Sequence, residues 1–329
     1  MAKNKRPSRD DISLMVAAAQ LCFNKGKTQE EVGEILGVSR PKVSRLLSQA
    51  REHGIIEITI RNPIVNKSMV QADLIEQFGL DDAVITPYTV DQQDVIVPQI
   101  AAAAAEYLSD NLPDRAVLGL GRGYAMYEMV KSLKPRKAQR PTTLPLSGGV
   151  GGIDAGNPFD EILNVAAAAL GGEAKFLYAP ALLASEKFRD SVLAEPRSQE
   201  IARLWDEMDW VVVGIGTIPP MRGVVNPYFD RSLDAFVKET GVKPVAEVSL
   251  RFILPDGRIP DTSRQQCLVA ATPEQIRKAK VRMAVAGGLA KLPAIYASLL
   301  TGMFNVLVTD EHTAEELVKL KTGNKPGQQ

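Results

Sequence analysis

Hydrophobic residues near the start of the chain recur every three or four positions, which is the spacing of one face of an α-helix. Three such runs follow one another, over about 10–24, 28–37 and 39–53. Each run is short, and polar residues separate it from the next. The pattern predicts three consecutive short helices, preceded by a basic arm over 1–9.

The ends of the second and third helices carry clear sequence signals. Thr28 and Glu31 have the spacing of a capping box, and Gly37 suits the left-handed turn that ends a helix. Ser39 is a candidate N-cap for the third helix, with Pro41 in the first turn, where no backbone donor is lost. These signals predict two helices joined by a tight turn.

The two helices can share one small core, because each has an apolar face. These faces consist of Val32, Ile35, Leu36 and Val38 on the second helix and Val43, Leu46, Leu47 and Ala50 on the third. Gly33 is small where the helices must approach closely. The segment 55–61 (IIEITIR) is β-branched and predicts a strand. A helix-turn-helix followed by a strand indicates a winged helix-turn-helix.

A different pattern begins after a helix predicted over 68–78. Apolar, β-rich runs alternate with helical stretches at 83–88, 116–121, 142–149, 174–180, 210–216, 281–288 and 305–310. Such continuous apolar strands separated by helices indicate an α/β fold, with a parallel sheet covered on both faces. An insertion over 245–258 predicts further strands near the opening at the strand ends.

Length and pattern together suggest a small module joined to a large one. For the 329 residues we expect a helix-turn-helix domain over 1–61, a linker and connecting helix over 62–80, and a ligand-binding and oligomerisation domain over 81–329. Hydrophobic residues make up 45% of the chain and charged residues 24%, which is typical of globular proteins. No run is long and apolar enough to span a bilayer, and no signal-like segment follows the N-terminus, so we expect a cytoplasmic protein.

The charge is unevenly distributed, although its formal total is zero. Residues 1–61 hold 11 Lys and Arg against 7 Asp and Glu, and the remainder holds 28 against 32. A basic N-terminal segment followed by a slightly acidic remainder fits a nucleic-acid partner. Chance variation would also explain so small a difference in charge. Cys22 and Cys267 show neither metal-ligand nor disulfide spacing, so we expect two buried structural thiols and no metal site.

The polar face of the third helix is the candidate DNA-reading surface. The predicted contacts are Thr28, Ser39, Arg40, Lys42, Ser44, Arg45, Gln49 and Arg51. Arg40 and Lys42 lie at the end of the helix that reaches base edges, whereas Arg45 and Arg51 suit phosphates. The alternative is an ordinary solvated basic helix in a bundle. Because a single unit of this size buries little surface, we expect at least a dimer on a two-fold site.

Glycine-rich corners follow three of the predicted strands. They contain Gly121, Arg122 and Gly123; Ser147, Gly148 and Gly149; and Gly214 and Gly216. Glycines let a ligand approach the backbone, and helix N-termini at the carboxyl ends of parallel strands attract anions. One such corner is weak evidence, but three on one sheet predict an anion-binding crevice.

Two charged residues extend this prediction. Lys291 lies close to a predicted helix start, where a cation opposes the helix dipole unless an anion is bound nearby. A solvent-exposed lysine or a surface ion pair is the alternative. Glu247 can accept hydrogen bonds from sugar hydroxyls, or it can be a buried structural carboxylate.

These motifs together resemble the SorC-type family of sugar-responsive bacterial transcription regulators, in the SorC/DeoR group, over nearly the whole chain. The resemblance is carried by TQEEVGEILGVSRPKVSRLL, GLGRG, PLSGG and VGIGT, and by the block AVAGGLAKLPAIYASLL and its continuation to 318. It implies a Rossmann-like effector domain that resembles sugar-phosphate isomerases without their catalysis, and it implies a tetramer. It also implies a phosphorylated sugar or polyol as effector, held by the three glycine corners, Glu247 and Lys291.

The chain departs from the family pattern at two positions. Gly123 stands where family members often have Thr or Ser, so one hydroxyl donor is missing, and Glu247 stands where Asp is usual. Because of these two departures, the sequence does not fix the chemical identity of the effector.

The sequence leaves two candidate functions for the protein. The first is an operator-binding regulator of a carbohydrate or polyol operon, with repression released by the effector and no cofactor. The second is a sugar-phosphate isomerase, deaminase or lactonase-like enzyme with an accessory DNA module. Such an enzyme needs a positioned acid or base. The chain has only two histidines, His53 and His312, which favours the regulator.

Overall fold

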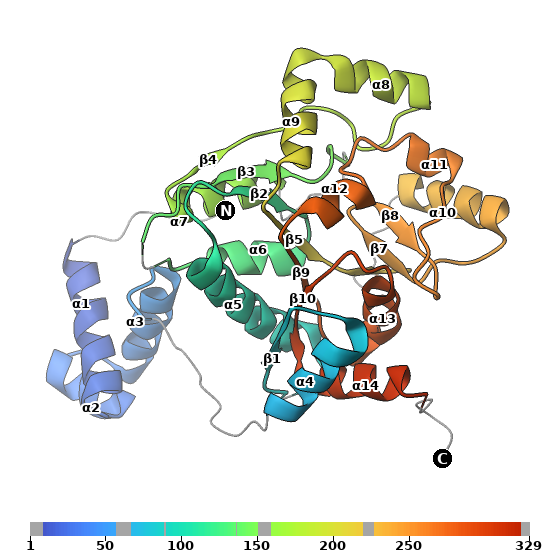
Figure 1. Ribbon diagram of the computed structural model, residues 1–329. Helices are drawn as coiled ribbons and strands as arrows, with labels where there is room; N and C mark the ends of the chain where they lie inside the picture. Colours follow the sequence, from blue (N-terminus) through green and yellow to red (C-terminus); the bar gives the residue numbers. More distant parts are fainter. Residues whose placement is uncertain are drawn as a thin grey trace. The chain divides into compact units, whose positions relative to one another are not determined.

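A computed structural model describes residues 9–56, 67–88, 90–135, 137–150, 159–219 and 227–323. The chain divides into two compact units, Met1–Pro63 and Ile64–Gln329 (Figure 1). The strand predicted over 55–61 lies largely outside the described residues, so the wing stays a prediction.

The first unit is a helix-turn-helix. It contains α1 (Arg9–Ala19), a π-helical turn η1 (Gln20–Asn24), α2 (Gln29–Leu36) and α3 (Arg40–Glu52). The capping box is confirmed, since the Glu31 backbone N–H donates to Thr28 Oγ1 at 3.3 Å and the Thr28 N–H donates to Glu31 Oε2 at 2.8 Å. Gly37 ends α2 with φ +65°, in the left-handed region. Ser39 is the N-cap of α3 by position, but its side chain makes no capping hydrogen bond.

The core of this unit joins all three helices. Its buried residues are Met15, Ala18, Ala19, Val32, Val43, Leu46, Leu47 and Ala50. The prediction that Ile35 is buried was wrong, because 56% of it is exposed. The inward arc of α2 is set by Val32, Gly33 and Leu36, and at 3.6 residues per turn Ile35 lies roughly 110° from the middle of that arc.

Gly33 is required by the turn between the two helices. A Cβ at this position would lie 2.7 Å from the Val38 carbonyl oxygen, which is backbone and cannot move aside cheaply. We expect Gly33→Ala to destabilise the unit by about 1–3 kcal/mol, as overpacking does, and to speed amide exchange in α2 and α3 about tenfold or more. Hydrogen exchange by mass spectrometry on the full chain measures this. Gly37→Ala is the matched control, because an added Cβ meets nothing within 4 Å there and only the strain of φ +65° remains. Equal exchange in the two variants would contradict the steric argument.

The second unit is built on a seven-stranded parallel sheet in the order β1-β10-β9-β5-β2-β3-β4. Its strands are β1 (Asp82–Thr86), β2 (Val117–Leu120), β3 (Thr142–Pro145), β4 (Glu173–Ala174), β5 (Trp210–Gly214), β9 (Val281–Val285) and β10 (Val306–Asp310). The α/β fold and all seven strands are confirmed. Most strands are shorter than predicted. The prediction of a strand over 174–180 was wrong beyond Ala174. There the run leaves the sheet edge after the Lys175 N–H donates to the Thr143 carbonyl, and it later forms an isolated bridge between Pro180 and Gly149.

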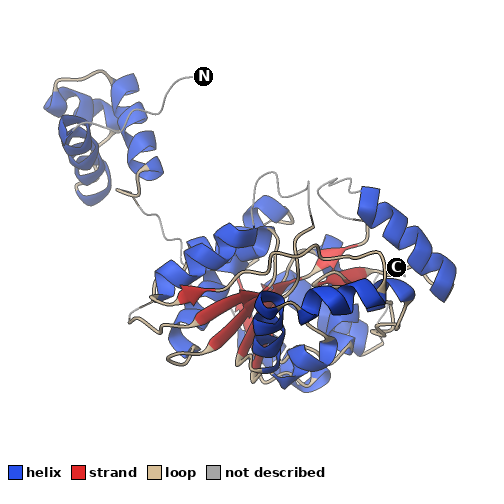
Figure 2. Ribbon diagram, turned by 90° about the horizontal axis from the view of Figure 1, so that it is seen from above, coloured by secondary structure: helices blue, strands red, loops and turns tan. Residues whose placement is uncertain are grey.

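Helices cover both faces of the sheet (Figure 2). One face packs against α5 (Gln93–Asn111), α6 (Tyr124–Lys131) and α7 (Phe159–Leu170). The other packs against α4 (Lys67–Phe78), α9 (Pro196–Asp206), α12 (Pro273–Lys278), α13 (Leu292–Leu300) and α14 (Glu311–Lys321). In β5, Trp210 and Val212 enter the first layer and Val211 and Val213 the second, as alternation along a strand requires.

The insertion predicted over 245–258 supplies two of the three strands of a small second sheet. The sheet is antiparallel and consists of β6 (Gly216–Thr217), β7 (Ala246–Val248) and β8 (Arg251–Ile253), in that order. Ser249 and Leu250 form the β7–β8 turn with φ +47° and +69°. This sheet extends from the end of β5, so it borders the carboxyl edge of the large sheet.

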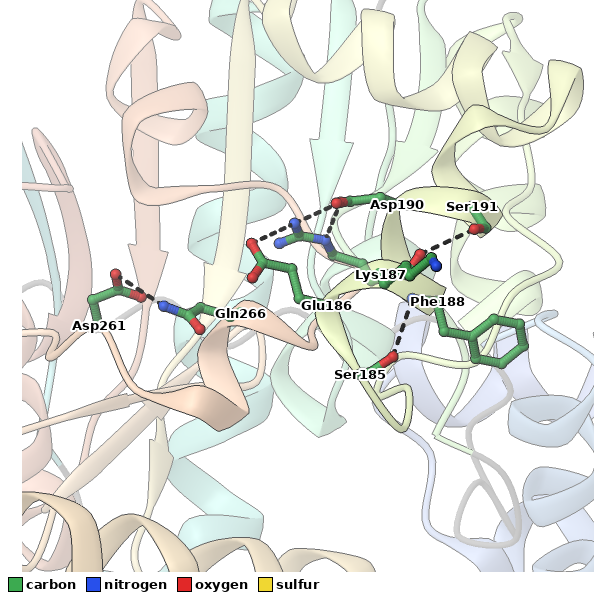
Figure 3. A network of polar contacts seen from close by, with 9 residues as sticks. Ser185, Glu186, Lys187, Phe188, Asp190, Ser191, Asp261 and Gln266 are labelled. Atoms are coloured by element: carbon green, nitrogen blue, oxygen red, sulfur yellow. Dashed lines mark hydrogen bonds and ion pairs between the residues drawn. The ribbon is translucent and has the colours of Figure 1, made fainter.

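The remaining helices are α8 (Glu186–Ala194), α10 (Pro227–Thr240), α11 (Ser263–Gln266) and the 3-10 turn η2 (Leu289–Lys291). Helix α8 has no fully buried residue, but Val192 and Leu193 pack half-buried against the core, and local polar contacts add to this packing (Figure 3). The Phe188 backbone N–H donates to Ser185 Oγ at 3.2 Å, and Arg189 pairs with Asp190 at 2.6 Å. The Phe188 ring points away from these contacts and is 53% exposed.

The structure also tests the expectations for the two cysteines and for the helix over 68–78. Cys22 and Cys267 are free thiols, but each is half-buried rather than fully buried: Cys22 lies in η1 at the margin of the first-unit core, and Cys267 is the C-cap of α11. The helix predicted over 68–78 is confirmed as α4, which packs within the second unit. None of the helices within the described ranges is long and apolar enough to cross a membrane.

Candidate functional site

The charged face of α3 is fully presented to solvent. All eight predicted DNA contacts are exposed, whereas Val43, Leu46, Leu47 and Ala50 on the other side are buried. Arg40 and Lys42 stand in the first turn, and Arg51 stands in the last. The helix therefore offers one continuous polar face, with cations in its first turn, at Arg45 in its middle and at Arg51 in its last turn.

Thr28 differs from the other predicted contacts, because its side chain is already engaged. Its hydroxyl accepts from the Glu31 N–H, and Glu31 in turn pairs with Lys27 at 3.1 Å. The hydrogen bond from the Thr28 backbone N–H, helped by Lys27, lowers the pKa of Glu31 below its usual value. Thr28 thus fixes the start of α2, and any contact it makes with DNA must leave this cap intact.

The first glycine corner joins β2 to α6. The Gly121 N–H donates to the Val212 carbonyl at 2.8 Å, and a Cβ on Gly121 would lie 3.2 Å from the Val213 Cα. Gly123 is the N-cap of α6 with φ +112°, a conformation that residues other than glycine rarely adopt. Both glycines are therefore needed to bring the start of α6 to the end of β5.

Arg122 ties this corner to the second one. Its Nη2 donates to Ser147 Oγ at 2.9 Å and to the Gly148 carbonyl at 2.8 Å. Its guanidinium carbon also lies 5.4 Å from the centre of the Phe159 ring. The structure therefore brings the first two predicted corners together around one cation.

The glycines of the second corner serve the fold. The Gly148 N–H donates to the Val269 carbonyl at 2.9 Å, and the Gly149 N–H donates to the Ala179 carbonyl at 2.8 Å. A Cβ on Gly148 would collide with the Ala179 carbonyl. These amides are satisfied within the protein, so Ser147 and Arg122 are the groups of this corner that suit a ligand.

The third corner gathers Gly214, Gly216, Glu247 and Lys291. Lys291 Nζ donates to the Ile215 carbonyl at 2.8 Å, and Gly216 pairs with Glu247 between β6 and β7. Glu247 Oε1 accepts the Leu250 N–H, and Glu247 Oε2 lies 3.1 Å from where a Cβ of Gly216 would be. A Cβ on Gly214 would lie 3.9 Å from the Arg122 carbonyl oxygen, so this corner adjoins the first.

Sequence reasoning missed the residues that position Lys291. The Gly288 N–H donates to Asp310 Oδ2 at 2.7 Å and to Thr313 Oγ1 at 2.8 Å, and Gln93 Nε2 donates to the Gly287 carbonyl at 2.9 Å. Asp310 is 1% exposed and also caps α14. The glycine pair directly after an apolar strand was the available signal.

The strand order fixes how far these groups are spread. Lys291 follows β9, Gly214 ends β5, Gly123 follows β2 and Ser147 follows β3, and these four strands are consecutive neighbours. With about 4.8 Å between strands, the edge from β9 to β3 is roughly 14 Å long. The charged groups lie closer together than the strand ends, because the Lys291 side chain reaches the Ile215 carbonyl after β5 and the Arg122 side chain reaches Ser147 after β3.

A cavity of about 280 Å³ opens at the Ser147 end. It is lined by Pro145, Ser147, Gly149, Phe159, Asp160, Leu177, Tyr178 and Ala179. A second cavity, of about 310 Å³, lies around Gly257, Pro273 and Arg277 and includes none of the predicted residues. Across the described ranges, no three His, Cys, Asp or Glu side chains come together as a metal site would require.

Comparison with models of known protein families identifies the family to which this chain belongs. The model of the "Putative sugar-binding domain" family matches residues 62–319, and that of the Crp-like helix-turn-helix domain matches residues 12–69. The chain belongs to this sugar-binding domain family. The resemblance to SorC-type regulators is thereby confirmed.

Relatives in this family match nearly end to end. The sorbitol operon regulator of Klebsiella pneumoniae is 27% identical over 312 residues, which cover 94% of this chain and 99% of the relative. The deoxyribonucleoside regulator of Bacillus subtilis is 24% identical over 311 residues, covering 94% and 98%. The crystal structure of the full-length sorbitol operon regulator SorC from K. pneumoniae superposes with a TM-score of 0.70 at 26% identity, over 94% of this chain and 100% of that one.

Proposed function

We propose that this protein is a transcriptional regulator of a carbohydrate or polyol catabolic operon, whose operator binding is modulated by a phosphorylated sugar or polyol. The observation that carries the proposal is the exposed charged face of α3 on a capped helix-turn-helix, in a chain whose larger unit belongs to a sugar-binding domain family. The relatives are named as regulators of sorbitol and deoxyribonucleoside genes, which supports the same role here.

At the DNA, α3 lies in the major groove. Arg40 and Lys42 in its first turn reach base edges, and Arg45 and Arg51 neutralise phosphates. One such helix buries too little surface for tight binding, so the protein acts as a dimer or tetramer on two half-sites about 34 Å apart.

At the effector site, the negative group lies near Gly123. There the N-terminal end of α6 provides the positive end of a helix dipole, with Arg122 on the β3 side and Lys291 on the β9 side. Glu247 accepts hydrogen bonds from hydroxyls, because its second oxygen faces Gly216 at the same edge. An anion with several hydroxyls, such as a sugar phosphate, matches this combination of charges.

Coupling to the DNA-binding unit runs through α13 and α4. Lys291 is the N-cap of α13, and Tyr296 in α13 packs edge-on against Phe78 of α4 at 5.8 Å. Lys321 of α14 covers the same Phe78 ring at 5.4 Å. A shift of Lys291 on ligand binding thus reaches the helix that follows the connection from the first unit. We infer that effector binding releases the operator.

The larger unit binds its ligand without catalysing a reaction on it. Glu247 has one oxygen committed to the Leu250 N–H, and Lys291 and Arg122 are bound to carbonyl oxygens. These groups suit recognition more than proton transfer, which needs an acid or base free to approach the reacting atom.

Binding to labelled DNA tests the proposal. In fluorescence anisotropy, a duplex from the protein's own promoter region should bind about 10³-fold or more tightly than a scrambled duplex, and this binding should weaken as salt increases. A panel of sugar and polyol phosphates should contain a compound that changes the affinity by about 5- to 150-fold. Equal affinity for both duplexes at low salt would overturn the proposal.

A further inference from the structure

The cavity beside Ser147 has the composition of a carbohydrate site. Its walls are mainly apolar, with Phe159, Leu177 and the Tyr178 ring among them, and the polar side-chain groups of its lining residues are the Ser147 and Tyr178 hydroxyls and the Asp160 carboxylate. Small-molecule pockets typically combine such apolar walls with a few placed polar groups. At about 280 Å³, the space suits a single sugar ring.

Tyr178 is the unusual member of this lining. It is 77% exposed, so its large ring gains little from burial. It is nevertheless oriented, because it stacks on Phe176 with ring centres 6.1 Å apart and an angle of 27° between the planes. The Tyr178 ring is therefore a supported apolar surface at the cavity, of the kind that the C–H face of a sugar ring can cover.

Charges are placed at different sides of this cavity. Arg122 does not line the cavity itself but adjoins it, since it donates to Ser147 Oγ and lies over the ring of Phe159, two residues that do line it. Asp160, in the first turn of α7, lines the wall as an acceptor for hydroxyl groups and repels a phosphate. A sugar phosphate is thus oriented with its phosphate towards Arg122 and Gly123 and its ring towards Tyr178.

We propose that the effector binds as a closed-ring sugar phosphate, with its ring in the cavity against Tyr178 and its hydroxyls on Asp160 and Ser147. This inference rests on the proposed effector site and specifies the chemical class of its ligand. A closed ring offers a rigid C–H face, whereas an open-chain polyol has no such face and must freeze several rotatable bonds to fit.

Matched pairs of ring-locked and open-chain phosphates test the inference by isothermal titration calorimetry on the full chain. The pairs are 1,5-anhydroglucitol 6-phosphate with glucitol 6-phosphate, 1,5-anhydromannitol 6-phosphate with mannitol 6-phosphate, and 1,4-anhydroribitol 5-phosphate with ribitol 5-phosphate. In at least one pair the ring-locked member should bind about tenfold more tightly.

Variants connect the preference to the cavity. Tyr178→Ala should weaken the ring-locked ligand about tenfold and leave the open-chain ligand within about twofold, while Tyr178→Phe keeps the ring and the affinity. Phe188→Ala is the matched control, because it removes another exposed aromatic ring, from α8, that does not line the cavity. Since Tyr178 is mostly exposed, each variant should melt at the wild-type temperature.

The outcomes separate this inference from the proposed function. Equal or tighter binding of the open-chain member in every pair, or an equal loss for both members in Tyr178→Ala, overturns the closed-ring inference and leaves the effector site standing. If no member of any pair binds at millimolar concentration, the closed-ring inference falls, and the phosphorylated effector falls with it if no compound of the wider sugar and polyol phosphate panel changes operator affinity.

Discussion

Replacing Arg40 by alanine is expected to weaken operator binding by about ten- to hundredfold, the loss of about 1–3 kcal/mol that follows removal of a base-contacting arginine. Arg40 is exposed in the first turn of α3, at the border of the polar face, about 70° from the middle of the buried arc formed by Val43, Leu46, Leu47 and Ala50. A cation there opposes the helix dipole, so its removal should not destabilise the helix. Anisotropy titrations at fixed salt measure the affinity, and a melting curve checks the fold.

Two further variants identify the kind of contact that is lost. Arg51→Ala, in the last turn of α3, should weaken operator and scrambled duplexes alike and reduce the salt slope by about one unit, as the loss of a phosphate contact does. Lys131→Ala removes a charge from the second unit, where the side chain is 51% exposed, and should change nothing. If Arg40→Ala bound the operator within twofold of wild type, α3 would not be the reading helix.

The local features of the first unit could be predicted because their causes are local. The capping box at Thr28 and Glu31 and the left-handed Gly37 depend on residues three or four positions apart, and both are present. The prediction that Ile35 is buried was wrong because the neighbouring helices α1 and α3 determine which side of so short a helix faces the core. The presence of Gly33 shifts that direction, since the turn backbone occupies the space beside it.

The seven strands could be predicted from continuous apolar runs, because a strand buried on both faces has few polar positions. Their ends could not, since a strand stops where its partner stops. β4 at the sheet edge pairs with β3 alone and holds only two residues. The chain beyond it supplies Leu177, Tyr178 and Ala179 to the cavity, and no periodic pattern marked those positions.

The three glycine corners were predicted from composition, but the role of each glycine depends on distant backbone. Gly148 donates to Val269, and Gly149 donates to Ala179. Arg122 follows β2 and donates a hydrogen bond to Ser147, which follows the neighbouring strand β3. Sequence spacing cannot reveal these partners, because they follow from the order of strands in the sheet. The contribution of each predicted residue to ligand binding stays a prediction.

Replacing Lys291 by alanine is expected to abolish the response to effector while leaving operator affinity in the absence of effector within about twofold. The ammonium group lies at the Ile215 carbonyl in the third corner, which adjoins the first through Gly214 and Arg122, and it is far in sequence from α3. A charge-assisted hydrogen bond to a phosphate contributes about 1.5–3 kcal/mol, so effector affinity should fall about ten- to hundredfold, and the response should be lost at the effector concentration that half-saturates the wild type. Operator titrations with increasing sugar phosphate measure the response.

Two comparisons make the Lys291 result specific. Lys291→Met keeps most of the aliphatic stem and should fail to respond as the alanine variant does, because the charge and not the packing is required. Lys319→Ala removes a lysine of α14 that pairs with Glu316 at 2.7 Å and should respond normally. An effector that binds the folded state raises the melting temperature of wild type and of Lys319→Ala, but should not raise that of either Lys291 variant at the same concentration. A normal response in Lys291→Ala would remove this lysine from the effector site and leave Arg122 and the start of α6 to hold the anion.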